Sequence, residues 1–462
     1  MTTSHSLREP VSTKVTFAAA GLGIRRITTF RAWFPTIPFI SYWVTSLLFY
    51  EFGPLVNPRL RPQTYLYLAV SLAVFLVGYH LALHRKRESN VLVLRGEIRR
   101  AVRWVQWTSV FALIGELGLV ADRLLSGAGS ISRSLYETEY VRTEFVRNTT
   151  WLTTISVLPY ALSLISIAGY FYCLGTRQRV SRWVHAVIFL QMALDVLNAF
   201  LSVNRGPVYY LLTYWLICCF FAMGISVRDA VWSARYRLAR LGFVLFLVLA
   251  CTYIYFIARN RNSGEYLEAM ANNVTTTGRY DFLRTRDRDF GALMSLVFYG
   301  THEFEFIDAF VERADWVSFH PTFLVGGRFI DQIQRAYPNF TPKEWEIAAD
   351  WVADAGLPPS AWPSVFGWPL VMFGSLGAIV FFFGLGSLFG GMTGRYLARG
   401  EFGALVGVFC LYAALNMSFN WIGGDFTHNA GYLAAIWLIA TAERAPTPVR
   451  RLLSPLSDAD KA

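Results

Sequence analysis

Long apolar runs separated by short polar segments occupy most of the chain. Each run approaches the roughly 20 residues that a helix needs to cross the hydrocarbon core of a bilayer. The pattern predicts an all-α, polytopic integral membrane protein with about ten transmembrane helices. We expect these helices at 36–56, 64–83, 104–122, 151–174, 184–203, 207–225, 242–258, 364–390, 403–419 and 428–442.

Two long polar segments interrupt this pattern, at about 123–150 and 259–363. Loops of such length are usually functional. We therefore divide the chain into a basic tail, seven helices, one large outward loop, three helices and a second tail. The corresponding residues are 1–35, 36–258, 259–363, 364–442 and 443–462.

The large loop contains signals for short helices. Thr341–Glu344 is a capping-box pattern with proline at the first helical position, and Gly356 marks the end of the helix that it predicts. We expect this helix to lie on the membrane surface. Residues 290–313 predict a second helix, either re-entrant or at the surface, with its bend at Gly300-Thr301.

Positive charge is concentrated on one side of this topology. The chain has 42 Lys and Arg against 31 Asp and Glu, a formal net charge of +11. An even number of spans places both termini on one side, and the segments on that side hold more than half of the basic residues. Because positively charged loops resist translocation, that side is predicted to be cytoplasmic. The basic excess therefore does not indicate nucleic-acid binding.

Composition agrees with this topology. Hydrophobic residues make up 54% of the 462 positions and charged residues 16%, which disfavours a soluble enzyme. The five cysteines lie within apolar runs, and no cluster of His, Cys or carboxylate residues has metal-ligand spacing. We expect no metal site and no cofactor.

Arginines gather where the large loop begins. Arg259 and Arg261 lie at the boundary of the seventh predicted helix, and Arg279 follows. Outward arginines run against the positive-inside tendency, so their number here calls for a reason. The guanidinium group matches phosphate oxygens in charge and geometry, which indicates a lipid diphosphate as ligand. For Arg259 and Arg261, contact with lipid headgroups is the alternative.

A further arginine, Arg205, lies in the tight turn between the fifth and sixth predicted helices, where Gly206 and Pro207 reverse the chain. A charge is costly at the hydrocarbon boundary, so we expect a bound anion there. Two acids, Glu116 and Asp195, lie within predicted spans. Each is expected to be either a functional relay or a hydrogen-bond partner in helix packing.

Acid–base chemistry has a candidate in His302, Glu303 and Glu305. A neighbouring carboxylate raises the basicity of an imidazole and orients its ring, and positions i and i+3 of a helix can face each other. A surface histidine without a catalytic role is the alternative. His320 and the pair Asp425 and His428 compete for the same role.

Three features together resemble the Wzy-type O-antigen and exopolysaccharide polymerases of bacterial inner membranes. They are the Arg205-Gly206-Pro207 turn that opens an apolar helix, the large outward loop late in the chain, and the F-G-x-x-G pattern at 373–377. Many members have an acid shortly before that pattern, whereas residues 360–367 contain none.

The resemblance implies metal-independent glycosyl transfer at the periplasmic face, with both termini in the cytoplasm. Oligosaccharide repeat units linked to undecaprenyl diphosphate would be joined into a polysaccharide. The lipid bilayer surrounds the protein, and its expected partners are a chain-length regulator and a flippase of the same pathway.

Such a transfer needs a base for the acceptor hydroxyl and cations for the departing diphosphate. His302 and Glu303 are expected to act as the base and its orienting group, while Glu305 helps to place sugars. Stabilisation of the leaving group is expected from four arginines, Arg205, Arg259, Arg261 and Arg279.

Two other functions remain open. An O-antigen ligase shares the architecture and the lipid diphosphate donor but transfers completed chains to a different acceptor. A lipid-linked oligosaccharide flippase or transporter would explain Glu116 and Asp195, although the long outward loop and the absence of recognisable inverted repeats favour a polymerase.

Overall fold

The computed structural model describes residues 29–53, 57–84, 94–125, 151–176, 178, 180–201, 216–224, 232, 237–261, 297, 300–320, 337, 343–357, 364–415 and 433–441. Regular structure in these residues is helical throughout, which confirms the all-α prediction for this part of the chain. The principal elements are α1 (Thr29–Trp33), α2 (Ile37–Phe52), α3 (Pro62–His84), α4 (Leu94–Leu125), α7 (Trp151–Tyr160), α8 (Ser163–Gly175), α9 (Arg182–Leu201), the π-helix η2 (Ile217–Ala222), α12 (Arg237–Arg261), α15 (Glu303–Arg313), α17 (Lys343–Asp354), α18 (Gly367–Arg399) and α19 (Phe402–Leu415).

Helical residues occur inside each of the ten apolar segments singled out in the sequence. Three described stretches are long and apolar enough to cross a membrane: Pro62–His84, Trp151–Gly175 and Gly367–Arg399. These stretches indicate that the chain is a membrane protein. The short helix predicted after Thr341–Glu344 is present as α17, and its end is confirmed, since Gly356 has a positive φ of +66°.

The predicted helix 151–174 is divided in the structure. A turn at Ala161 and Leu162 separates α7 from α8, and the amide of Ala161 still donates to the carbonyl oxygen of Val157 at 3.0 Å. Pro159 has no N–H and its ring crowds the preceding turn, which is the usual cause of such a break.

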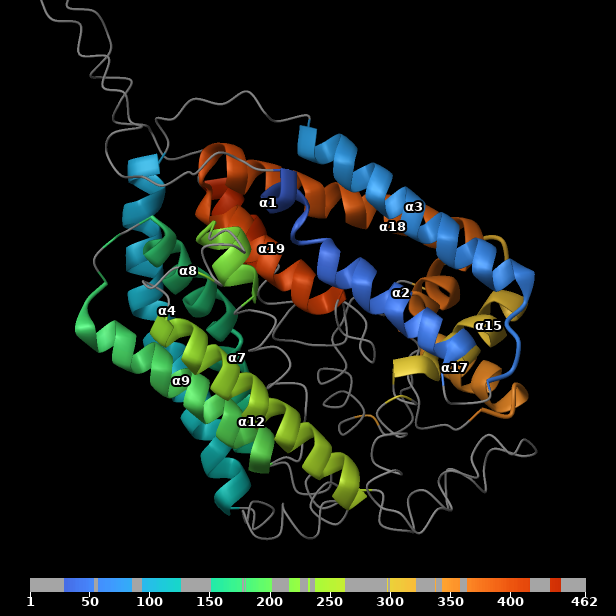
Figure 1. The fold of residues 1–462 in the computed structure, drawn as a ribbon, viewed down its shortest axis with the longest axis horizontal. Helices are drawn as coiled ribbons and strands as arrows, with labels where there is room; N and C mark the ends of the chain where they lie inside the picture. Colours follow the sequence, from blue (N-terminus) through green and yellow to red (C-terminus); the bar gives the residue numbers. More distant parts are fainter. Residues whose placement is uncertain are drawn as a thin grey trace, which may run out of the picture.

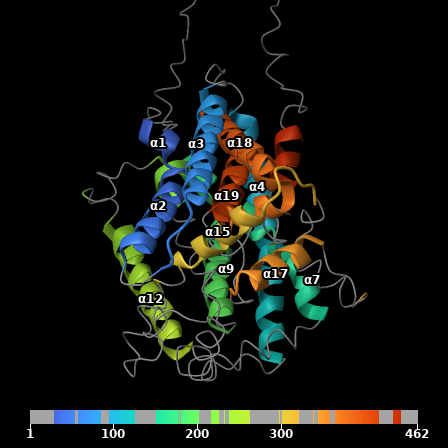
Figure 2. The ribbon, with the colours of Figure 1, turned by 90° about the vertical axis from the view of Figure 1, so that its right-hand side faces the viewer.

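The helices form two groups (Figure 1). In the first, α3 lies along α18, with α2, α15 and α17 nearby; in the second, α4 packs against α7, α8 and α9. Between the groups, α19 contacts α18, α8 and α4, while η2 contacts α8 and α1. The helix α12 lies at the edge of the molecule in Figure 2.

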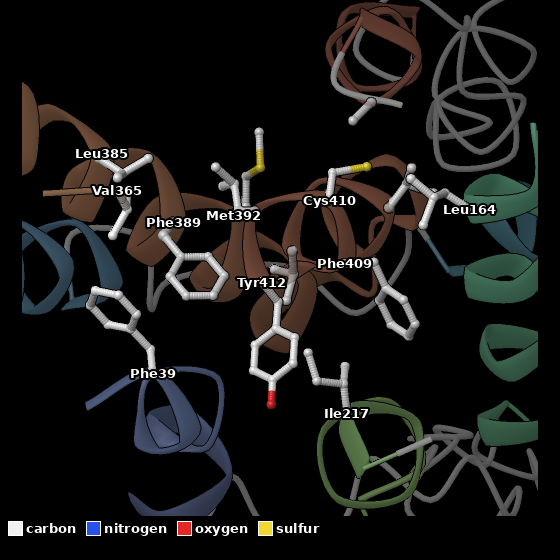
Figure 3. Packing of buried hydrophobic residues seen from close by; sticks show 14 of the residues in the cluster. Phe39, Leu164, Ile217, Val365, Leu385, Phe389, Met392, Phe409, Cys410 and Tyr412 are labelled. Atoms are coloured by element: carbon white, nitrogen blue, oxygen red, sulfur yellow. The ribbon is translucent and has the colours of Figure 1, made fainter. Parts of the chain in front are cut away.

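A continuous apolar core joins the two groups (Figure 3). It runs from Phe39 of α2 and Phe389 of α18, through Tyr412 of α19 and Ile217 of η2, to Leu164 of α8, all of them buried. Lipid tails are as apolar as these side chains, so inside a membrane such a core holds helices together mainly through close van der Waals packing.

Glycines allow α3 and α18 to approach each other closely. Gly386 and Gly390, four residues apart on α18, face the carbonyl oxygens of Phe75 and Tyr79 on α3. This spacing is the small-residue pattern that brings membrane helices into backbone contact. The close packing of α3 against α18 therefore depends on glycine, which has no side chain, at these two positions.

Replacing Gly390 with alanine should destabilise the protein. A Cβ there would lie 2.8 Å from the Cα of Tyr79 and closer still to its carbonyl oxygen, so α3 and α18 would have to separate. Overpacking of this kind typically costs about 1–3 kcal/mol. Thermal unfolding of the purified protein measures the effect. Gly391→Ala is the matched control, because nothing lies within 4 Å of its added Cβ; equal unfolding temperatures for the two variants would contradict the packing argument.

A cluster of charged side chains lies where the start of α4 meets the turn between α18 and α19. Glu97 of α4 accepts a hydrogen bond from the Phe402 amide at 3.0 Å and pairs with Arg100 at 3.5 Å. At the junction of α18 and α19, Glu401 pairs with Arg395 at 2.6 Å and with Arg399 at 3.2 Å. These contacts tie the first turns of α4 to the α18–α19 turn.

Glu97 should make stability depend on pH. Burial, aided by the charge of Glu401, raises its pKa above the ordinary 4.5, against the opposing effects of the Phe402 amide and Arg100. At pH values between the unfolded and folded pKa of Glu97, the native state therefore holds a proton that the unfolded chain has lost. The stability that this proton uptake contributes at low pH is lost as pH rises through that window. We expect the unfolding temperature of the wild type, minus that of Glu97→Gln, to increase as pH falls through this window. A difference that does not vary with pH would contradict the assignment.

Candidate functional site

Helix α18 is broken at Gly374, inside the F-G-x-x-G pattern. Its φ of +70° and ψ of −178° form a conformation that is essentially limited to glycine. A Cβ at this position would lie 2.6 Å from the carbonyl oxygen of Asp315 and 2.9 Å from the amide nitrogen of Ser318. The pattern therefore has a structural role, since it opens the helix to the segment 315–320.

The segment 315–320 binds to the break through its backbone. Groups released by a helix break need partners where water is absent, and this segment supplies them. Four hydrogen bonds join the two: from Ser375 N to Asp315 O (2.8 Å), Leu376 N to Trp316 O (3.0 Å), Ser318 N to Phe373 O (3.1 Å), and His320 N to Met372 O (2.9 Å). An exposed acid, Asp315, thus comes to lie next to the F-G-x-x-G pattern, although no acid precedes that pattern in residues 360–367.

The helix α15, immediately before this segment, is fixed on several sides. Phe304 lies edge-on to Trp43 of α2 at 5.8 Å, and Phe310 lies edge-on to Trp351 of α17 at 5.2 Å. Asp308 accepts hydrogen bonds from the Arg61 amide (2.9 Å) and the Thr64 hydroxyl (2.5 Å), just where α3 begins. The described part of the large polar segment therefore packs against helices of the first group.

The predicted acid–base residues form the first turn of α15. His302, at the N-cap position, is 5% exposed, Glu303 is 1% exposed and Glu305 is half-buried. The His302 ring lies edge-on to Phe306 at 6.0 Å, and the Glu305 amide donates to the His302 carbonyl oxygen at 3.1 Å. The alternative of an ordinary surface histidine is wrong, because this turn is buried. The helix α15 packs against α18, α17 and α3. The regular helix is interrupted at His302, one residue after the bend predicted at Gly300-Thr301, although the backbone angles of His302 remain in the helical region.

The predicted arginine cluster falls largely outside the described residues. Arg205 and Arg279 lie in parts that the structure does not describe, and Arg259 and Arg261 are described only by their backbone, in the last turn of α12. Their convergence on a diphosphate remains a prediction. Of the competing acid–base candidates, His320 lies on the segment bound to α18, whereas Asp425 and His428 are outside the described residues.

The structure brings together two acids that the sequence treated separately. Glu116 of α4 and Asp195 of α9 lie side by side, and the Tyr160 hydroxyl donates to Asp195 at 3.2 Å. A sequence signal was available: Gln191, Asp195 and Asn198 follow helical spacing and so share one face of α9. Which helix covers that face depends on tertiary packing.

Two polar sites therefore occur inside the described helices, the first turn of α15 beside the broken α18, and the carboxyl pair between α4 and α9. Among the described residues, no group of three His, Cys, Asp or Glu side chains is placed to hold a metal ion. No protein-family model, curated protein or solved structure matches the chain.

Proposed function

We propose that the protein is a polysaccharide polymerase of a bacterial inner membrane. It joins oligosaccharide repeat units carried on undecaprenyl diphosphate into an O-antigen or exopolysaccharide, by metal-independent glycosyl transfer at the periplasmic face. Ten helices cross the membrane, both termini lie in the cytoplasm, and residues 259–363 form the periplasmic loop. The partners are the lipid-linked substrate and, within the pathway, a flippase and a chain-length regulator.

The observation that carries this proposal is the union of the large polar segment with the broken helix α18. Residues 300–320 belong to this segment, and they include the buried turn at His302 and Glu303 that begins α15. Phe304 of α15 contacts Trp43 of α2, and the residues after α15 bind through their backbone to α18 at Gly374. A reaction between a water-soluble glycan and a carrier embedded in lipid needs polar chemistry fixed at membrane helices. A loop that served only as a connection would not need this anchoring.

The chemistry requires two kinds of group. The acceptor hydroxyl must lose a proton, which is the role we assign to His302, with Glu303 orienting it. The departing diphosphate carries developing negative charge, and Arg205, Arg259, Arg261 and Arg279 supply the positive charge that stabilises it. Glu305 contacts the sugar.

The test is incubation of the purified protein with a lipid-linked repeat unit, followed by separation of the products by length. A ladder of longer glycans on the lipid carrier is expected. Transfer of intact chains to a different acceptor without elongation would instead identify a ligase. Movement of the substrate across the vesicle membrane without a change in length would identify a flippase.

Arginine variants test the diphosphate site. Arg205→Ala or Arg259→Ala, at normal membrane abundance, should reduce chain elongation by about 100-fold or more, the usual effect of removing one preorganised charge-stabilising group. Arg237→Ala is the matched control, because Arg237 is exposed at the opposite end of α12. Long chains at the wild-type yield in both variants would reject the assigned roles.

A further inference from the structure

Three helices converge on one pair of carboxyl groups. Glu116 of α4 is fully buried, Asp195 of α9 is 6% exposed, and the two side chains are close enough to interact directly. The Tyr160 hydroxyl of α7 donates a hydrogen bond to Asp195 Oδ1 at 3.2 Å. Nothing in the proposed glycosyl transfer uses this pair.

Close packing of α4 and α7 encloses the pair. A Cβ on Gly115 would meet the backbone of Tyr160, and one on Gly118 would meet the Ser156 hydroxyl. The backbones of α4 and α7 therefore touch directly beside Glu116. The pair lies in a helix interface and not at a surface.

The geometry of the pair calls for a proton. Two adjacent carboxylates in a low-dielectric interior cannot both remain ionised. Because a carboxylate only accepts hydrogen bonds, Glu116 and Asp195 can bond to each other only when one of them is protonated. Within the described residues, no donor hydrogen bonds to either carboxyl oxygen of Glu116. The described cation that acts on Glu116 is Arg123, seven residues and roughly 10 Å further along α4.

Buried polar side chains continue on both sides of the pair. Gln191, one turn before Asp195, is 1% exposed, and its amide nitrogen donates to no described group. On the other side of the pair, six residues after Glu116 on α4, Asp122 accepts a hydrogen bond from the Thr153 hydroxyl of α7 at 2.5 Å, and both residues are buried. A buried donor of this kind needs an acceptor such as water, and rows of such groups can transfer protons.

We propose that Glu116 and Asp195 together bind one proton, which exchanges with the aqueous phase along this row of buried polar side chains. The activity is distinct from glycosyl transfer, and it couples the packing of α4 against α9 to proton uptake. When the proton leaves, two negative charges face each other and α9 is driven away from α4. When it returns, the carboxyl–carboxyl hydrogen bond closes the interface.

Infrared spectroscopy of the full-length protein in phosphatidylglycerol vesicles tests the proposal. The wild type should show the carbonyl band of a protonated carboxyl at neutral pH. This band should weaken as pH is raised and shift when H₂O is replaced by D₂O. Difference spectra against Glu116→Gln and Asp195→Asn, which preserve size, should each show loss or displacement of the band. Asp308→Asn is the control and should retain it, since Asp308 lies on α15, where it accepts hydrogen bonds from the Arg61 amide and the Thr64 hydroxyl, and does not belong to the pair.

Three results would overturn the proposal. The first is the absence of such a band from the wild type at neutral pH, which requires no variant. The second is a band that is unchanged in whichever of the two pair variants folds. The third is a band that does not shift in D₂O, which would show a permanently buried proton and leave the pair with a packing role alone. None of these measurements depends on polymerase activity, so either proposal can fail while the other stands.

Discussion

Replacing His302 with glutamine should reduce the rate of repeat-unit joining by about 10²- to 10⁴-fold, the range in which a positioned general base contributes. Glutamine retains hydrogen-bonding capacity and much of the volume of the side chain, but it cannot take the proton of an acceptor hydroxyl near neutral pH. His302 occupies the N-cap position of α15 without a side-chain capping hydrogen bond. The substitution therefore removes the titratable ring and leaves the start of the helix without the loss of a cap.

The measurement is the elongation rate of a lipid-linked repeat unit by the purified variant, with its pH profile. Loss of the base should remove the acidic limb of the wild-type profile, a change that a purely structural defect would not produce. His320→Gln is the comparison, because His320 is the competing candidate and binds to α18 through its backbone. If His302→Gln retained wild-type rates while His320→Gln did not, the base would be His320.

The sequence alone predicts the helical elements well, and for a physical reason. Apolar runs of membrane-spanning length and local stop signals are properties of neighbouring residues, so α3 and α17 were found where expected. Continuity was harder to predict. One expected helix is divided into α7 and α8 next to Pro159. Whether a proline breaks a membrane helix depends on the helices around it, which a local pattern does not contain.

The candidate sites depend on contacts between distant segments, which no local pattern contains. The residue types of His302 and Glu303 indicate acid–base chemistry, but their burial depends on how α15 packs in the fold, against α18, α17 and α3. Likewise, Glu116 and Asp195 lie 79 positions apart, and their pairing follows only from the arrangement of α4 and α9. Residue type thus indicates which chemistry is available, whereas tertiary packing decides which groups meet.

The role of the F-G-x-x-G pattern likewise becomes visible only in the tertiary structure. In the sequence it contributed only to a family resemblance. In the structure, Gly374 has a positive φ, and the segment 315–320 follows the broken helix closely enough that a Cβ would not fit. The pattern therefore specifies a break in α18 and a docking point for the large loop.

Replacing Gly374 with alanine should detach the segment 315–320 from α18 and abolish polymerisation. The backbone conformation alone costs a non-glycine residue about 1–3 kcal/mol. The new Cβ would also press on the Asp315 carbonyl oxygen from 2.6 Å, breaking hydrogen bonds that are each worth about 1 kcal/mol. Because Asp315 follows α15 by only two residues, displacement of this segment should also move the buried turn at His302. We expect a lower unfolding temperature together with loss of elongation.

The matched control lies ten residues further along the same helix. Gly384→Ala introduces the same methyl group where nothing lies within 4 Å and where φ is not positive, so both stability and elongation should be retained. Limited proteolysis of the large loop separates detachment from general unfolding. In Gly374→Ala, cleavage within 315–320 should accelerate at temperatures where the rest of the protein remains folded. If Gly374→Ala matched Gly384→Ala in cleavage, stability and elongation, the broken helix would not be the anchor that positions the loop, and the proposed link between α18 and the reaction would fail.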